Sequence, residues 1–125
     1  MNSNINTEEY FFHAKNHLLK QNAVCWDNNR NIRYKFSSNG VVLASPFGNV
    51  LPYEFYSEEL ESVELYKILM PQYKLDKFIP YLRDIRYYFS NVDPIIAKRI
   101  EEIHNLGMRS LWHYKLSQLR LWVRQ

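Results

Sequence analysis

The stretch 93–125, DPIIAKRIEEIHNLGMRSLWHYKLSQLRLWVRQ, carries the clearest folding signals in this chain. Asp93 followed by Pro94 predicts a helix start, because an aspartate N-cap satisfies free backbone N–H groups and proline suits the first helical position. Isoleucines then recur at helical spacing until Gly107, which supplies the left-handed residue that ends a helix at little cost. We therefore expect two consecutive helices that meet at Gly107.

The second of these helices is apolar around most of its circumference. On a helical wheel its apolar side chains cover about 220°, which leaves a narrow polar wedge. This coverage predicts a helix packed into the core, with both Trp112 and Trp122 buried. Lys115 falls inside the apolar arc, so it must either extend to solvent or meet an acidic group. The wedge contains the basic side chains Arg109, Arg120 and Arg124 together with His113.

The positive charge of the chain lies in its second half. Residues 1–62 carry five Lys or Arg and seven Asp or Glu, whereas residues 63–125 carry eleven and six, for a total of +3. From Ile103 onward there are basic residues and no acid. Such local asymmetry favours an anionic partner.

The segment 57–92 is also predicted to be helical. Ser57 precedes two glutamates and so begins a helix that Pro71 closes. Asp76 begins another helix, which tolerates Pro80 in or near its first turn. The expected inner face of this helix consists of Phe78, Leu82, Ile85 and Phe89.

Arg83 and Tyr87 fall on the polar side of the same helix, one turn apart. An exposed tyrosine beside an arginine is typical of an interface anchor. If this helix packs beside the last helix, both side chains join the basic wedge in one patch. The expected partner-binding residues are therefore Arg83, Tyr87, Arg109, His113, Arg120 and Arg124.

The segment 23–56 is predicted to form a three-stranded antiparallel meander and a connection. In IRYKF (32–36) apolar and basic residues alternate with the period of a half-buried strand. The short apolar runs AVCWD (23–27) and VVLA (41–44) flank it, and Asn39-Gly40 suits a tight hairpin turn. The rest, up to residue 56, is interpreted as a connection with one short edge strand.

The N-terminal segment 7–22 is predicted to be an amphipathic helix with Thr7 as N-cap, and residues 1–6 are predicted to be disordered. Its expected core residues are Phe11, Phe12, Leu18 and Leu19. The fold class is therefore α+β and helix-dominant: one N-terminal helix, a small three-stranded meander and about four C-terminal helices. At 125 residues, all of them fit one domain, 1–125, with one core.

A single cysteine, Cys25, excludes an internal disulfide and fits a reducing, cytoplasmic setting. No signal peptide is expected, and no apolar run is long enough for a transmembrane segment.

Candidate chemistry is sparse. His13 and His17 share one helix face at metal-ligand spacing, but no further ligand is indicated, so we expect neither a metal nor a cofactor. Cys25 would act as a nucleophile only beside an activating base, and its apolar neighbours favour a small core residue instead. We do not expect an enzyme.

The expected function is protein binding, as an inhibitor, immunity-type factor, adaptor or accessory subunit. The partner would be another protein with an acidic surface, which complements the basic wedge. The alternative is a nucleic-acid-binding accessory protein that contacts phosphates through the same side chains. Attachment of the last helix to a membrane surface and formation of a homo-oligomer both remain open.

Overall fold

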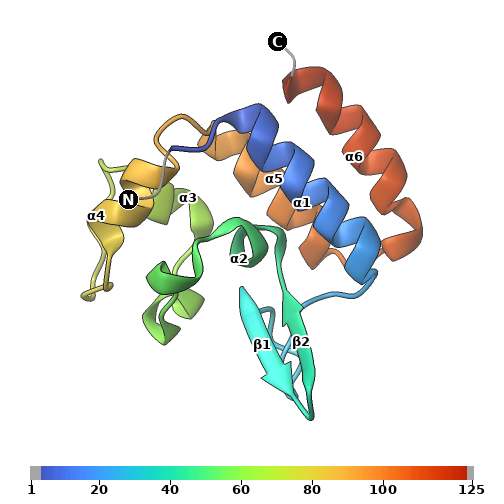
Figure 1. The fold of residues 1–125 in the computed structure, drawn as a ribbon, viewed down its shortest axis with the longest axis horizontal. Helices are drawn as coiled ribbons and strands as arrows, with labels where there is room; N and C mark the ends of the chain where they lie inside the picture. The colour runs from blue at the N-terminus through green and yellow to red at the C-terminus, as the bar shows by residue number, and fades with distance from the viewer. Residues whose placement is uncertain (1–3, 124–125) are drawn as a thin grey trace.

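The computed structural model describes residues 4–123, which form six α-helices and one two-stranded antiparallel sheet. The long helices α1 (Thr7–Gln21), α5 (Pro94–Asn105) and α6 (Arg109–Val123) pack against one another. The hairpin projects from one side of this group, and the shorter helices lie beside the hairpin and toward the end of the molecule away from α6 (Figure 1). Buried side chains from the long and the shorter helices form one hydrophobic cluster, to which the hairpin strands contribute no buried residue.

Helix α5 begins and ends, and helix α6 begins, where the local signals predicted. The Asp93 side chain accepts a 2.9 Å hydrogen bond from the Ile95 N–H, and Pro94 is the first helical residue. Gly107 has a φ of 71° between the two helices, which confirms the predicted break. Trp112 of α6 is 1% exposed and its indole N–H donates to the Ile103 carbonyl, so it joins both helices in the core.

The N-terminal helix begins at Thr7, the predicted bound, but its N-cap is the preceding residue, and residues 4–6 have a defined structure. Asn6, not Thr7, is the N-cap, and it forms a reciprocal capping box with Glu9. Ile5 is buried, and its N–H donates a 3.0 Å hydrogen bond to the Tyr88 carbonyl. The predicted disorder is therefore wrong for residues 4–6, and residues 1–3 lie outside the described range. In the predicted core face, Phe11 and Leu18 are buried but Phe12 and Leu19 are exposed.

The predicted three-stranded meander is a two-stranded hairpin. Strands β1 (Lys35–Ser38) and β2 (Val41–Ala44) pair across Asn39 and Gly40, which both have positive φ. The run 23–27 makes a single bridge, between Trp26 and Ile32, and no strand.

The Asp27 side chain explains the missing strand. It accepts hydrogen bonds from the backbone N–H groups of Asn29 and Asn31, while the Asp27 N–H donates to the Asn31 carbonyl. These bonds close a tight local turn, which competes with a strand ladder.

The connection that follows is helical rather than an edge strand. It forms α2 (Pro46–Val50) and a 3₁₀ turn, η1 (Tyr53–Phe55). The Ser45 side chain caps α2 by accepting from the Gly48 N–H. Gly48 lies so close to the hairpin that a Cβ there would stand 1.9 Å from the Tyr34 carbonyl oxygen. The backbone contact therefore requires glycine at this position.

The segment 57–92 is helical in shorter pieces than predicted. The first predicted helix is a 3₁₀ turn, η2 (Glu58–Ser62), followed by α3 (Leu65–Leu69). The second begins only at α4 (Leu82–Tyr88), because Tyr81 is left-handed at φ 61°. Phe78 therefore precedes the helix and is 81% exposed, whereas Ile85 and Phe89 are buried as predicted.

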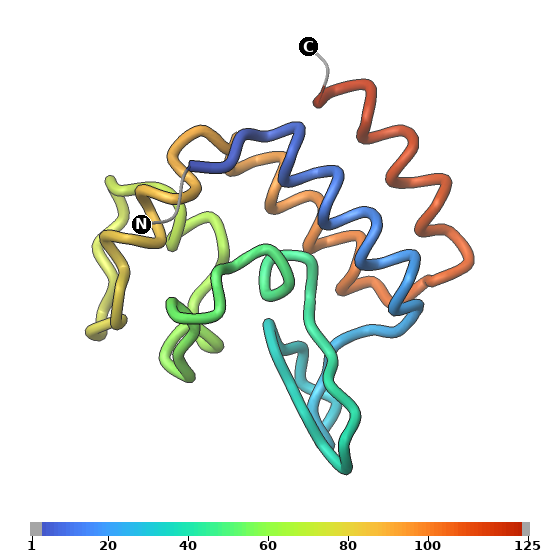
Figure 2. The backbone as a smooth tube through the Cα atoms, viewed as in Figure 1, coloured from blue at the N-terminus to red at the C-terminus, as the bar shows by residue number. Residues whose placement is uncertain are grey.

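Arg86 joins α4 to the chain around α3. Its guanidinium donates to the backbone carbonyls of Lys67, Ile68, Met70 and Tyr73. It thereby satisfies carbonyls that a short helix leaves without partners at its C-terminal end. The chain trace in Figure 2 shows these segments side by side at the end of the molecule opposite α6.

Candidate functional site

Helix α6 is covered on one side only. Its buried residues are Trp112, Leu116 and Leu119, which face α1 and α5. Tyr114, Leu121 and Trp122 are 62%, 69% and 68% exposed. The predicted burial of Trp122 is therefore wrong, because α6 lies at the edge of the helix group with neighbours on one side (Figure 1).

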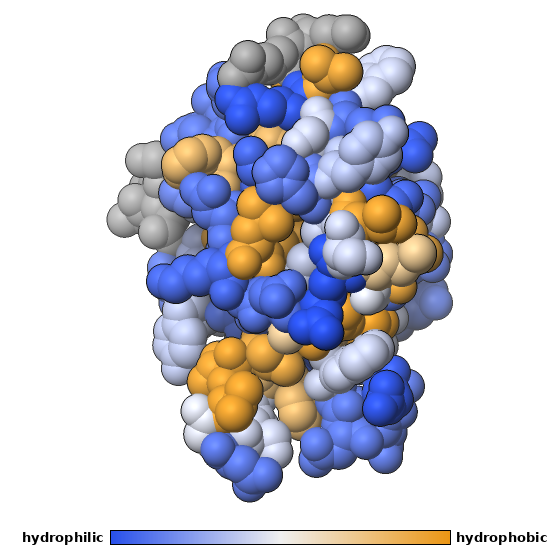
Figure 3. Space-filling model, turned by 90° about the vertical axis from the view of Figure 1, so that its right-hand side faces the viewer, coloured by the Kyte–Doolittle hydropathy of each residue, from blue (hydrophilic) through white to orange (hydrophobic). Residues whose placement is uncertain are grey.

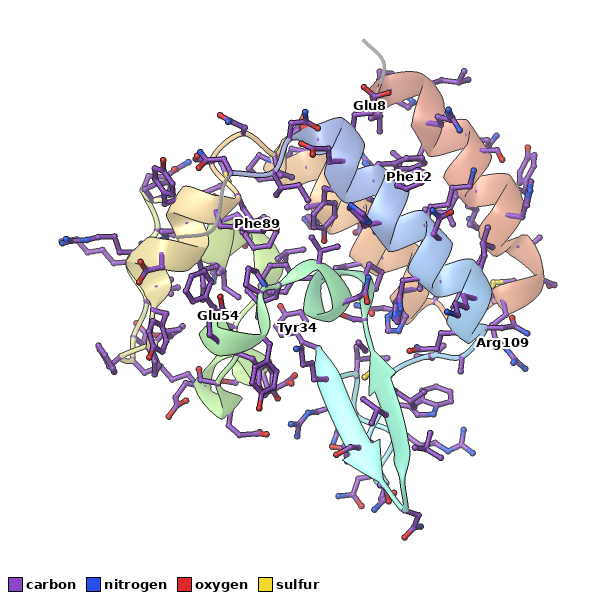
Figure 4. All side chains as sticks on the ribbon, in the orientation of Figure 1. Glu8, Phe12, Tyr34, Glu54, Phe89 and Arg109 are labelled. Atoms are coloured by element: carbon purple, nitrogen blue, oxygen red, sulfur yellow. The ribbon has the colours of Figure 1, made fainter. Side chains whose placement is uncertain are left out.

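The predicted basic residues of α6 are exposed and lie on its flank toward α1. The Arg109 guanidinium donates a 2.7 Å hydrogen bond to the Asn22 carbonyl at the end of α1. Arg120 lines a shallow hollow of about 150 Å³ between the two helices, together with Phe12, Lys15 and Glu8. In Figure 4, Phe12 lies in the space between α1 and α6. Arg124 falls outside the described residues.

We define the basic flank as Lys15, Arg109, His113 and Arg120. Within residues 4–123 the two ion pairs both involve Arg33, with Glu58 and Glu61. The described part of α6 contains no acidic residue. Its cations are therefore free to meet an acidic group on another molecule. Figure 3, which faces this side of the molecule, shows apolar residues interspersed with hydrophilic ones.

The structure does not bring Arg83 and Tyr87 together with α6. Both residues are exposed on α4, which lies at the opposite end of the molecule (Figure 1). The single patch expected from side-by-side packing is therefore not formed. The predicted residues divide into two separate surfaces.

On its other flank α6 forms a groove with α5. This groove has a volume of about 920 Å³, and Lys115 lies in its wall, half-buried. Ile95, Leu106 and Trp122 supply exposed apolar surface to it. The sequence identified Lys115 as a polar residue in an apolar arc, and the groove is where that side chain lies.

A buried carboxyl group was missed by the sequence analysis. Glu101 is 5% exposed and accepts a 2.5 Å hydrogen bond from the Phe47 N–H and a 3.0 Å bond from the Ser45 hydroxyl. Loss of solvent raises its pKa to about 7. No local pattern separates it from exposed Glu102, because the packing of α2 decides which one is buried.

Glu101 also lines a cavity of about 610 Å³. Glu61 and Arg33 line the same cavity and form an ion pair with each other. The Glu61 carboxylate accepts from the backbone N–H groups of Tyr34 and Lys35. These polar groups therefore fasten the hairpin to the helical part.

Cys25 and His104 meet in the core, but not as a catalytic pair. The backbone N–H of Cys25 donates a 2.8 Å hydrogen bond to the imidazole Nε2 of His104. Burial raises the pKa of the thiol to about 12, which keeps it protonated. His104 thus acts as a hydrogen-bond acceptor for the backbone.

The predicted histidine pair on α1 is divided between two environments. His13 is exposed, whereas the His17 Nε2 lies 2.8 Å from the Ala44 carbonyl oxygen of the hairpin. Among the residues described, no group of three His, Cys, Asp or Glu side chains is placed to hold a metal ion. None of the helices in this part of the chain has the length and apolar character needed to cross a membrane.

No protein-family model, curated protein or solved structure matches this chain. The fold itself defines a helix-rich α+β protein whose last helix is half-covered. Its surface must therefore be interpreted from its own residues.

Proposed function

We propose that this protein is a non-enzymatic protein-binding module, of the inhibitor, immunity-type, adaptor or accessory-subunit kind. It binds through the outer face of α6 and the basic flank. One observation carries the proposal: Tyr114 and Leu121 are more than half exposed on a helix whose cations have no acidic partner among the described residues.

Exposed apolar side chains favour a partner because covering them releases free energy, roughly 25 cal/mol for each Å² of apolar surface removed from water. Tyrosine and arginine are also the residue types that most often anchor protein interfaces. Tyr114 and Arg120 present both types on one helix. The outer face of α6 thus has the composition of an interface centre.

The charge of the basic flank favours an acidic partner surface. Arg109 and Arg120 follow one side of α6, with His113 between them, and like-signed charges on one side accelerate encounter with an opposite charge. Arg109 is partly engaged by the Asn22 carbonyl, which fixes its position rather than neutralising it. Arg120 is therefore the cation best placed to steer a partner, and the exposed His113 lies beside it on the same flank.

Nucleic acid is the second candidate, because the same cations would contact phosphates. A net charge of +3 with thirteen acidic residues is low for a dedicated nucleic-acid binder. Among the described residues no recognition helix, zinc finger or aromatic sheet surface of the kind that reads nucleic acid is seen either. We therefore rank the protein partner first.

The test is an affinity capture from the native cell lysate with paired variants. The double variant His113→Glu/Arg120→Glu should lose the captured protein while its melting temperature stays nearly unchanged, because both side chains are exposed. The control Lys74→Glu/Arg83→Glu makes a larger charge change on the other surface, −4 against −3 with His113 neutral, and should still retain the partner. Equal capture by both double variants would contradict the proposal.

Nuclease treatment distinguishes the two candidates. A protein partner should survive nuclease and moderate salt. Loss of all bound material after nuclease, with steep salt dependence, would replace the protein partner with nucleic acid.

A further inference from the structure

The two flanks of α6 differ in charge. The flank toward α1 is basic, as described above. The groove toward α5 carries two acids and two bases instead: Asp93, Glu102, Arg99 and Lys115. One flank is basic and the other has balanced charges, so the two surfaces of this helix suit partners of different kinds.

The groove also has apolar ends. Ile95 and Trp122 line it where α5 begins and α6 ends, and they are 51% and 68% exposed. Leu106, 61% exposed, lines it eleven residues further along the chain, about 16 Å away at the rise of an α-helix. The groove therefore offers two apolar contacts separated by charged side chains.

We propose that this groove is a self-association site, occupied by the α5–α6 pair of a second copy of the chain. A two-fold interface sets one surface against itself, so a surface with one sign of charge repels its own copy. The groove has equal numbers of acids and bases, which is the balance that such an interface needs. The basic flank has no such balance.

The placement of the charges adds to this argument. Glu102 is on the α5 wall and Lys115 is on the α6 wall. The α5 wall also carries Arg99, so a dimer pairs unlike charges where it sets Glu102 of one copy against Lys115 of the other. It also covers Trp122 and Ile95, two of the exposed apolar residues of the groove. Helix pairs that associate in this way form a four-helix bundle.

The inference goes beyond the proposed function and is independent of it. Tyr114, Leu121 and the basic flank face away from the groove. A dimer through the groove therefore leaves the proposed partner surface open on both copies.

The test is the molar mass of the purified chain, measured by sedimentation from low to high micromolar concentration. The wild type should rise from the mass of one chain toward that of two. Trp122→Glu should stay at the mass of one chain. Leu121→Glu is the matched control, because the neighbouring Leu121 is equally exposed but does not line the groove, and it should behave like the wild type.

Two outcomes would overturn the proposal. One is a wild type that keeps the mass of one chain at the highest concentration. The other is a dimer that Leu121→Glu weakens as much as Trp122→Glu does, which would move the interface to the outer face. Circular dichroism of both variants shows whether they are folded, so a loss of dimer is not mistaken for unfolding.

A charge exchange tests the pairing across the interface. Lys115→Glu and Glu102→Lys should each raise the dimer dissociation constant at least tenfold, because each leaves like charges opposed. The double variant restores the balance and should recover most of the lost affinity. A double variant no better than either single one would exclude this arrangement of α5 against α6.

Discussion

The imidazole Nε2 of His104 accepts a 2.8 Å hydrogen bond from the backbone N–H of Cys25. An acceptor at Nε2 places the ring proton on Nδ1, which lies 2.8 Å from the Asn105 side-chain oxygen and donates to it. The ring also stacks on Trp112, at 28° between the planes. In its neutral form, His104 thus connects α5, α6 and the chain before the hairpin.

Acid should weaken this connection. Burial lowers the pKa of His104 from its ordinary value of 6.5, so the unfolded chain takes up a proton before the folded one does. The contribution of this residue to stability is complete above pH 6.5 and decreases as the pH falls. Relative to wild type, His104→Gln should be destabilised most at pH 8 and least at pH 5, as measured by urea unfolding. A difference that does not change with pH would contradict this assignment.

The contribution of Glu101 to stability should have the opposite pH dependence. Its folded pKa of about 7 lies above the ordinary 4.5, so its contribution is complete below pH 4.5 and is lost as the pH rises through 7. Glu101→Gln keeps an acceptor for the Phe47 N–H without a charge. It should match the wild type near pH 4.5 and exceed its unfolding free energy by up to about 3 kcal/mol at pH 8. For the exposed control Glu59→Gln, the difference in unfolding free energy from the wild type should not change with pH. If the difference for Glu101→Gln also stays constant with pH, the carboxylate of Glu101 is not a buried charge.

Gly48 and Gly40 should differ in their tolerance of alanine. A Cβ at Gly48 meets the Tyr34 carbonyl at 1.9 Å, so the hairpin and α2 must separate. A Cβ at Gly40 meets nothing within 4 Å, and its cost is the left-handed backbone at φ 79°, about 1 to 2 kcal/mol. Thermal unfolding should therefore rank Gly48→Ala as clearly the less stable variant. Equal melting temperatures would show that α2 does not contact the hairpin as described.

Substitution of the two tryptophans of α6 should have different effects on stability, because one is buried and the other is exposed. Trp112→Ala removes a ring that is 1% exposed and should cost about 3 kcal/mol or more. Trp122→Ala removes a ring that is 68% exposed and should cost less than about 0.5 kcal/mol at concentrations where the chain is a single copy. Chemical denaturation measures both. Similar costs for the two substitutions would mean that α6 is packed differently.

The elements with strong local signals could be predicted from the sequence. Asp93-Pro94 and Gly107 define both ends of α5 without help from the rest of the molecule. The sequence could not show that the first strand of the expected meander is missing. The Asp27 side chain closes a local turn there, and apolar composition does not reveal that turn. The predicted helix 57–71 divides into η2 and α3, and its pattern of glutamates carries no sign of the break.

The candidate site was predicted in part. A helical wheel gives the exposure of Arg109, His113 and Arg120, since they lie opposite the apolar arc. It does not give the exposure of Trp122, because the wheel describes the helix and not the number of its neighbours. For the same reason the wheel could not place Arg83 at the other end of the molecule. The separation of the two surfaces depends on the order in which the helices pack.

The central claim, that the outer face of α6 binds another protein, is tested most directly by hydroxyl-radical footprinting of the chain alone and in the captured complex. Partner binding should protect Tyr114 and Leu121 while Tyr53 and Phe78, exposed on other parts of the molecule, remain labelled. Trp122 reports the groove separately, because self-association covers it with or without the partner. Unchanged labelling of Tyr114 and Leu121 in the complex would contradict the account.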